Sequence, residues 1–441
     1  LIIITHQQRT MSIADVLYGV TMRSDGSSRF APSDRYGYFP SVSLGWNVSK
    51  ESFWKFPQTD LKFRLSYGKT GNQDGIGNYA WQPLMSGGIN YGNNSGMAVT
   101  SMGNNKLTWE TADQYDFGFD LGFWNGKLNM IADIYLKNTN NLLYSMPLHG
   151  TSGFTSITSN IGSMRNYGVE FSINGHLNIG KVNWTSSFNI SHNKNKLTKL
   201  LGDDLLPIGS NRALKVGEEL GAFYLFQMDG LYQYDGEVPQ PLYDLGVRAG
   251  DVKYHDADNN GIINDNDRVL TGSSNPDFFG GWNNTFKYKG FQLDVFFTYM
   301  YGNDVYAEWA VTATRPGYRM AITEDVAKNR WTAPGSSDKY PRAVNTLCGH
   351  NSKNSTRFLE DGSFIRLRSL TFSYTFPQVM LQKICLKGLR LYVQGDNLLL
   401  FSKYSGWDPE VSKNMDPQYF GVDLYGVPPS RSVNFGINLS F

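Results

Sequence analysis

The sequence of 441 residues contains few cysteines, almost no net charge and no long apolar run. Its two cysteines, Cys348 and Cys385, match no metal-binding or redox spacing. The 40 basic and 39 acidic side chains nearly cancel, so there is no excess of basic charge to favour a nucleic acid. No apolar stretch approaches the ~18 residues that a membrane-spanning helix requires. A helical membrane protein is therefore excluded, and a nucleic-acid partner is not expected.

Signals of secretion and of catalysis are also missing. The first residues, Leu1 to Ile4, include no initiator Met and no basic region, and their apolar run is too short for a signal peptide. We therefore interpret this start as internal to a longer protein. No G-x-S-x-G, Walker or dinucleotide-binding glycine motif occurs, so we expect no enzymatic activity.

The sequence is instead rich in runs where apolar residues alternate with small or polar ones. This spacing places one kind of side chain on each face of a β-strand. The runs last about 9–12 residues, the length with which a tilted strand crosses a membrane, whereas strands of soluble proteins more often have about 5–6. They favour a membrane barrel over the alternative, a large soluble all-β protein. The clearest run is Val433, Phe435, Ile437, Leu439 and Phe441.

Short turns alternate with long connections along the chain. Tight reversals are predicted at Asn125-Gly126, Gly180-Lys181, Lys289-Gly290 and Lys387-Gly388. Long connections are predicted at 138–164, 193–279, 302–361 and 397–430. Outer-membrane barrels have this asymmetry, with short periplasmic turns and long extracellular loops. The predicted strands are 16–23, 37–48, 61–69, 112–124, 127–137, 165–178, 181–192, 280–289, 291–301, 362–376, 388–396 and 431–441.

Several segments, taken in order, resemble one family of transporters. They include Asp25-Gly-Ser-Ser-Arg-Phe30, Leu65-Ser-Tyr-Gly-Lys-Thr-Gly-Asn72 and Gly362-Ser-Phe-Ile-Arg-Leu-Arg368. In these the chain resembles the SusC/RagA-like TonB-linked transporters, and the resemblance extends from about Asp25 to Phe441. It implies an antiparallel transmembrane β-barrel of about 22 strands, of which residues 1–441 would supply about the last twelve. The family's plug domain and TonB-contacting segment have no counterpart in this sequence.

The resemblance also implies a function. Such proteins import a large nutrient, a glycan or an oligopeptide, across the outer membrane of Gram-negative bacteria. A SusD-like surface lipoprotein acts as a lid, and the TonB complex acts through the N-terminal part of the protein. Two alternatives stay open: a passive porin of twelve strands, and a surface protein that binds a partner in a calcium-dependent manner.

One loop has the spacing of a calcium site. Within an insert at 251–270, oxygen-bearing residues stand at loop positions 1, 3, 5, 9 and 12, with glycine at position 6. A backbone carbonyl would serve at position 7. The alternative is a surface loop whose Asx turns bind nothing. The candidate ligands of Ca²⁺ are Asp256, Asp258, Asn260, Ile262, Asn264 and Asp267.

Aromatic and charged residues supply the remaining candidates. The tryptophans Trp81, Trp309, Trp331 and Trp407 are expected in or near long loops, where they would stack on sugar rings or peptide side chains. The alternative is that they pack between loops or against the lipoprotein lid. Arg366 and Arg368 are expected to pair with acidic side chains of the lumen, namely Asp116, Asp120, Glu170 and Asp294.

Overall fold

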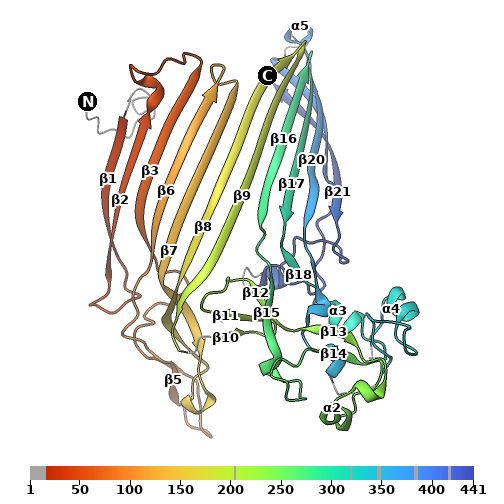
Figure 1. Cartoon of the computed structure of the whole chain (residues 1–441). Coiled ribbons are helices and arrows are strands. Elements are labelled where there is room, and N and C mark those ends of the chain that lie inside the picture. The colour runs from red at the N-terminus through yellow and green to blue at the C-terminus, as the bar shows by residue number, and fades with distance from the viewer. Residues whose placement is uncertain (1–15, 203–204, 318–319, 345–348, 382–385, 416–418) are drawn as a thin grey trace. The chain divides into compact units, whose positions relative to one another are not determined.

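The protein is built mainly of antiparallel β-strands, as a computed structural model shows (Figure 1). The structure describes residues 16–202, 205–317, 320–344, 349–381, 386–415 and 419–441. Both cysteines and the first 15 residues lie outside these ranges. Among the described residues, no helix is long and apolar enough to cross a membrane.

The principal sheet contains twelve strands that follow one another in chain order. Each prediction of a strand is confirmed, and the sequence pattern explains why: alternating residues give every strand one apolar and one polar face. The outer strands of the sheet are β1 and β22. The twelve are β1 (Val16–Gly26), β2 (Tyr36–Asn47), β3 (Thr59–Asn72), β6 (Glu110–Phe123), β7 (Leu128–Pro147), β8 (Ser156–Ile179), β9 (Val182–Leu200), β16 (Phe278–Tyr288), β17 (Phe291–Tyr301), β20 (Phe364–Thr375), β21 (Gly388–Ser402) and β22 (Ser432–Ser440).

The chain divides into two compact units. The first comprises residues 1–204 with 215–218 and 284–286, and the second comprises 205–214, 219–283 and 287–441. In the first unit the large sheet contains β1, β2, β3, β6, β7, β8 and β9, each paired antiparallel with the next. The predicted Asn125-Gly126 reversal joins β6 to β7, and both residues have positive φ, 56° and 79°. That conformation favours asparagine and glycine.

The predicted loop at 138–164 is wrong. Strands β7 and β8 run on through most of it, and only residues 148–155, with a short 3-10 turn at Gly150–Ser152, separate them. The segment is rich in Asn, Ser and Thr, which favour turns locally. Pairing of β7 with β8 nonetheless continues to Pro147 opposite Ser156 and satisfies the backbone groups of both strands.

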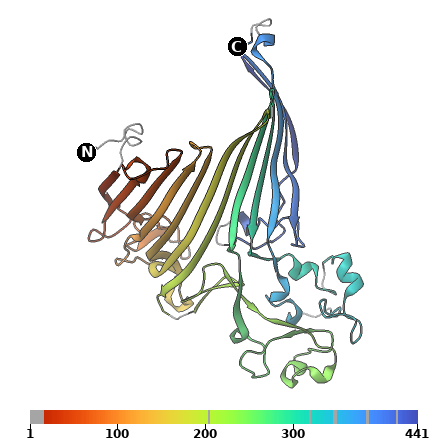
Figure 2. The same cartoon turned by 45° about the horizontal axis from the view of Figure 1, so that its top comes forward.

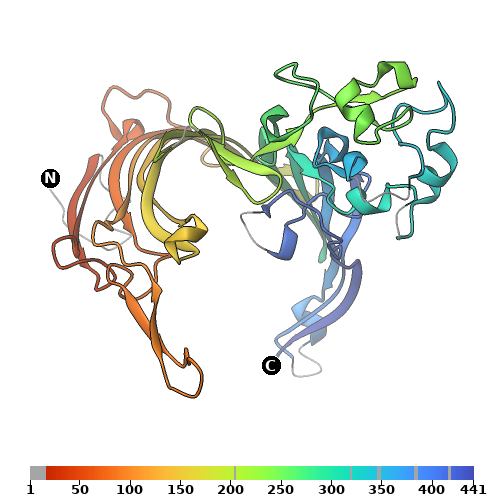
Figure 3. The same ribbon diagram turned by 90° about the horizontal axis from the view of Figure 1, so that it is seen from below.

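The first unit also carries a projecting hairpin and a small core. Strands β4 (Leu84–Gly87) and β5 (Met97–Ser101) pair only with each other, and Figure 3 shows this orange hairpin extending away from the large strands. Phe30, Phe39, Ile76, Leu107 and Trp109 form the core near the loop ends of the neighbouring strands.

In the second unit the long connections fold together at one end of β16, β17, β20 and β21 (Figure 1). The C-terminus lies at the opposite end, beside helix α5 (Gln378–Leu381), as Figure 2 shows. The predicted tight reversal at Lys387-Gly388 is wrong. Gly388 already belongs to β21 and cannot be part of a turn. Residues 376–387, which include α5, separate β20 from β21.

Short elements organise these long connections. A four-stranded sheet has the order β10-β11-β12-β15, and two-stranded sheets pair β13 with β14 and β18 with β19. Their bounds are β10 (Leu205–Ile208), β11 (Arg212–Lys215), β12 (Ala222–Phe226), β13 (Met228–Leu231), β14 (Val252–Tyr254), β15 (Arg268–Ser273), β18 (Asp304–Tyr306), β19 (Leu359–Asp361), α2 (Gln240–Asp244), α3 (Ala310–Ala313) and α4 (Glu324–Asn329).

Two hydrophobic cores hold the connections together. Core A consists of Phe223, Leu225, Val305, Tyr306, Ala307, Ala310, Phe358, Tyr404, Val411 and Val422. Core B consists of Phe226, Leu231, Tyr232, Val238, Leu242, Val247, Val252, Tyr254 and Ile263. Core A draws on three separate connections of the large sheet. These loops therefore fold as one packed body rather than as independent excursions.

Candidate metal site and loop aromatics

The candidate calcium loop links β14 to β15 in the second unit. Its turn depends on two residues in the left-handed region, Asn259 with φ of 56° and Gly261 with φ of 76°. Glycine accepts this conformation without a steric penalty, which is why loop position 6 requires it. The loop ends in a 3-10 turn at Asp265–Asp267, which the Asn264 side chain caps.

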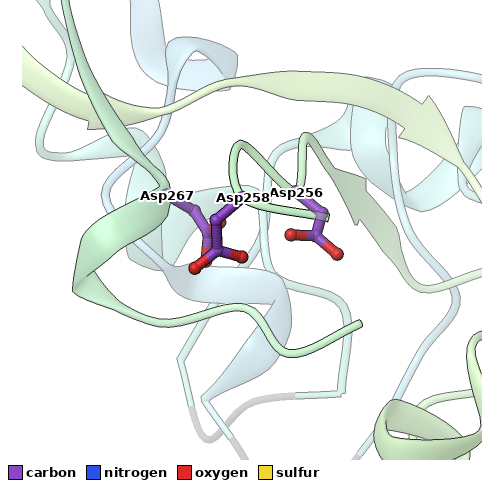
Figure 4. A group of neighbouring side chains, drawn as sticks. All are labelled: Asp256, Asp258 and Asp267. Carbon is purple, nitrogen blue, oxygen red and sulfur yellow. The ribbon is translucent and has the colours of Figure 1, made fainter. Parts of the chain in front are cut away.

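Three predicted ligands are brought together by this turn. Carboxylate oxygens of Asp256, Asp258 and Asp267 all lie within 4.8 Å of one another, and Figure 4 shows the three groups beneath the loop. Asp267 is fully buried, whereas Asp258 is exposed to solvent. A hard cation such as Ca²⁺ takes oxygen ligands in this kind of arrangement.

Backbone N–H groups hold these carboxylates in place. The Asp256 carboxylate accepts hydrogen bonds from the N–H groups of Gly261 at 2.6 Å and Asn260 at 3.2 Å. Asp267 accepts from Ala257 at 2.9 Å and Asn264 at 2.8 Å. Slight desolvation alone would raise the pKa of Asp256, but these N–H donors outweigh it and lower the pKa below its ordinary value. Asp256 therefore presents an ionised carboxylate.

The other three predicted ligands lie in the same turn, with their side chains engaged locally. The amide oxygen of Asn260 accepts from the N–H of Ile262 at 2.8 Å, and its amide nitrogen donates to Asp258 at 2.8 Å. The amide oxygen of Asn264 accepts from the N–H of Asn266 at 2.9 Å. These are Asx turns, which stabilise the loop backbone. Ile262 is 46% exposed.

The four predicted tryptophans do not form one site. Trp81 belongs to the first unit, and the other three belong to the second. Trp331 packs against core B and donates its indole N–H to Gln233 at 3.1 Å, so it is structural. Trp407 is 78% exposed. Trp309 packs against core A and also lines a cavity of about 600 Å³.

A charged cluster was not anticipated correctly from the sequence. Arg366 and Arg368 pair with Asp408 and Glu410, which follow β21, and not with the expected lumen acids. The Arg366 Nη2 atom lies 2.6 Å from Asp408 Oδ1, and both side chains are buried. The Asp-Pro-Glu sequence at 408–410 was the available signal, because two acids separated by one residue can face two arginines separated by one residue.

Comparison with known proteins identifies the family. Residues 10–398 match the family described as "TonB dependent receptor-like, beta-barrel". The chain belongs to this TonB-dependent receptor family. The proteins of this family are β-barrels of the outer membrane. They are receptors and transporters rather than enzymes.

Named relatives of this TonB-dependent receptor chain are longer proteins. TonB-dependent receptor P3 of Formosa agariphila is 34% identical over 96% of this chain and 44% of its own length. TonB-dependent receptor SusC of Bacteroides thetaiotaomicron is 30% identical, over 96% and 42%. A solved structure of the RagAB peptide transporter matches with a TM-score of 0.83 and 27% identity, over 97% of this chain and 46% of that one. The chain thus spans less than half the length of these relatives, and the resemblance to SusC and RagA is confirmed.

Proposed function

We propose that this chain forms part of the membrane-spanning wall of a TonB-dependent importer. The observation that carries the proposal is the row of apolar side chains that most strands of the large sheet leave exposed. On β22, Phe435 is 82% exposed and Ile437 is 66% exposed, while Asn434 and Asn438 alternate with them. Exposed apolar area costs roughly 25 cal/mol per Å² in water, whereas lipid accepts it. The alternating polar face would line the lumen.

The cargo and the partners follow from the family. We propose that the cargo is a large nutrient, a glycan or an oligopeptide, that a SusD-like lipoprotein covers the entrance, and that the TonB complex supplies energy through a segment outside this chain. Support comes from the similarity to SusC and to RagAB, the latter described as a peptide transporter. The end with long connections would face the exterior, as in other outer-membrane barrels.

Uptake measurements separate this proposal from a passive porin. We expect cells that carry the gene to accumulate labelled cargo from a panel of oligosaccharides and oligopeptides, and to lose this uptake when TonB is deleted. A deletion of the gene itself serves as the matched control. Uptake that persists without TonB, together with steady ion conductance of the purified protein in planar bilayers, would favour the porin. Surface binding without any uptake would favour the calcium-dependent binding protein.

We also propose that the 256–267 loop binds Ca²⁺ and thereby stiffens the surface around it. The specific observation is the convergence of Asp256, Asp258 and Asp267 in a turn with the spacing of a calcium loop. Ca²⁺ takes 6–8 oxygen ligands. Three carboxylates, the side-chain oxygens of Asn260 and Asn264 and the carbonyl of Ile262 would supply them after a local rearrangement of the Asx turns.

Calorimetry on the purified, chelator-treated protein tests the calcium site. We expect one Ca²⁺ to bind per chain, and Asp258→Asn, an exposed member of the cluster, to weaken binding at least about tenfold. Asp265→Asn is the matched control, because Asp265 lies in the same loop but pairs with Arg268 outside the cluster. Absence of any binding heat with the unmodified protein would refute the site.

A further inference from the structure

A cavity lined by both polar and apolar groups lies among α3, α4 and β19 in the second unit. Its volume of about 600 Å³ falls within the range of ~300–1,000 Å³ that is typical of small-molecule sites. The indole of Trp309 forms part of the wall, and its N–H donates to the Tyr404 hydroxyl at 3.1 Å, which fixes the ring. We refer to this space as the Trp309 cavity. Its walls come from residues within segments 309–314, 323–325, 339–340, 357–361 and 403–405.

The cavity contains charged groups of both signs. Within the part of the chain that the structure describes, none of these groups forms an ion pair with another. The six charged side chains of the lining are Asp325, Lys339, Arg357, Glu360, Asp361 and Lys403.

The cations are held by neutral groups. Arg357 donates to the carbonyl oxygen and the hydroxyl of Thr314, at 2.7 Å and 3.0 Å, and to the carbonyl oxygen of Asn351 at 3.2 Å. Burial lowers the pKa of Arg357 to about 10, so it stays charged at neutral pH. The Tyr340 hydroxyl raises the pKa of Lys339, which therefore also stays charged. Lys403 is exposed at the rim.

The carboxylates are held by neutral donors in the same way. Asp325 accepts from the Tyr340 hydroxyl at 2.6 Å, and that bond lowers the pKa of the carboxyl group. Glu360 accepts from the backbone N–H and the hydroxyl of Ser405, at 2.8 Å and 2.7 Å. The Ser363 hydroxyl likewise lowers the pKa of Asp361. The carboxyl groups of Asp325 and Asp361 therefore carry negative charge at neutral pH.

Fixed charges of both signs, hydrogen-bonded to neutral groups, suit a ligand that carries both signs itself. A neutral sugar could hydrogen-bond to these groups but would compensate neither set of charges, and an acidic sugar would compensate only the cations. We propose that the Trp309 cavity binds a short oligopeptide, with its terminal carboxylate at the Arg357 and Lys403 side and its ammonium group at the acidic side chains. A residue of the peptide would pack against the Trp309 ring. As a step in uptake, this site rests on the proposed importer function.

Calorimetry with defined small ligands tests the proposal on the detergent-purified protein. We expect trialanine to bind, and its C-terminally amidated and N-acetylated forms to bind at least about tenfold more weakly, because each loses a charge-assisted interaction. Maltotriose serves as the neutral sugar of comparable length. Equal affinity for trialanine and its amidated form, or tighter binding of maltotriose, would overturn the proposal.

Two substitutions locate the binding on the cavity. Arg357→Gln and Lys403→Gln are each expected to weaken trialanine binding at least about tenfold. The Lys403 variant guards against misfolding, because this side chain is exposed. Lys253→Gln is the matched control, an exposed lysine on β14 outside the cavity. Unchanged affinity in both cavity variants would show that the peptide binds elsewhere or nonspecifically.

The two proposals fail separately. If uptake requires TonB but trialanine does not bind, the importer stands and the peptide site is wrong. If trialanine binds at the cavity but no cargo enters in a TonB-dependent manner, the site stands and the importer is wrong. Binding therefore tests the cavity without any assumption about transport.

Discussion

The buried pair of Arg366 and Asp408 gives the sharpest test of how the loops are attached to the sheet. Arg366 lies on β20 and is 3% exposed, and Asp408 follows β21 and is 4% exposed. Removing one partner of a buried ion pair typically costs about 3–5 kcal/mol, because an uncompensated charge stays behind. Glu410 lies 2.9 Å from the Arg366 Nε atom, without hydrogen-bond alignment, and would compensate partly. We therefore expect Asp408→Ala to lower the free energy of unfolding by about 3 kcal/mol, the low end of that range.

Urea unfolding of the protein in lipid vesicles, followed by tryptophan fluorescence, measures this change. Lys328→Gln is the control, because Lys328 and Glu324 form an ion pair with side chains 69% and 80% exposed. Such surface pairs contribute about 0–1 kcal/mol. The double variant Arg366→Met with Asp408→Leu is expected to lose less than the sum of its single variants, since it leaves no buried charge unpaired. An Asp408→Ala loss as small as that of Lys328→Gln would refute the reasoning.

Three further predictions address the lipid face, the calcium loop and a buried histidine. Phe435→Lys should destabilise the inserted protein by about 2–4 kcal/mol, the cost of a lysine on the lipid face near the bilayer centre. Asn438→Lys, on the alternate face of β22, should not destabilise it. Urea unfolding in vesicles compares the two variants, and equal losses would contradict a lipid-facing Phe435. Gly261→Ala should weaken Ca²⁺ binding in calorimetry, because φ at this position is 76°. Burial lowers the pKa of His350 below its ordinary value of 6.5, so its contribution to stability is full above pH 6.5 and decreases as the pH falls through the folded pKa. The unfolding temperature should therefore depend less on pH between pH 7 and 5 in His350→Gln, a variant that keeps a donor for the carbonyl of Val252. An unchanged dependence of the unfolding temperature on pH would contradict this prediction.

The strands of the large sheet were predictable because their signal is local. A period of two residues in the sequence directly reports the two faces of a strand. Where the prediction failed, local chemistry pointed away from the long-range pairing. The Asn- and Ser-rich stretch at 138–164 resembles a loop, yet the partner strand extends β7 and β8 through it. Lys387-Gly388 resembles a turn, yet Gly388 pairs with Ser440 as part of β21.

The candidate sites show the same division between local and distant information. The three carboxylates of the calcium loop converge because they lie within twelve residues of one another, so spacing alone predicted their meeting. The partners of Arg366 and Arg368 lie 42 residues further along the chain, and no periodicity links them. The Trp309 cavity was equally invisible, because segments almost one hundred residues apart form its walls.

The packed long connections of the second unit explain how the Trp309 cavity and the candidate calcium loop can share one scaffold. Leu225 belongs to core A and the next residue, Phe226, belongs to core B, so β12 presents successive side chains to the two cores. Phe358 of core A directly follows Arg357 of the Trp309 cavity, and Ile263 of core B lies inside the calcium loop. A shift in the register of β12 would exchange these faces and disturb both sites at once. The packed cores therefore hold the segments that carry both proposed sites in position before any ligand arrives, which would reduce the conformational entropy lost on binding.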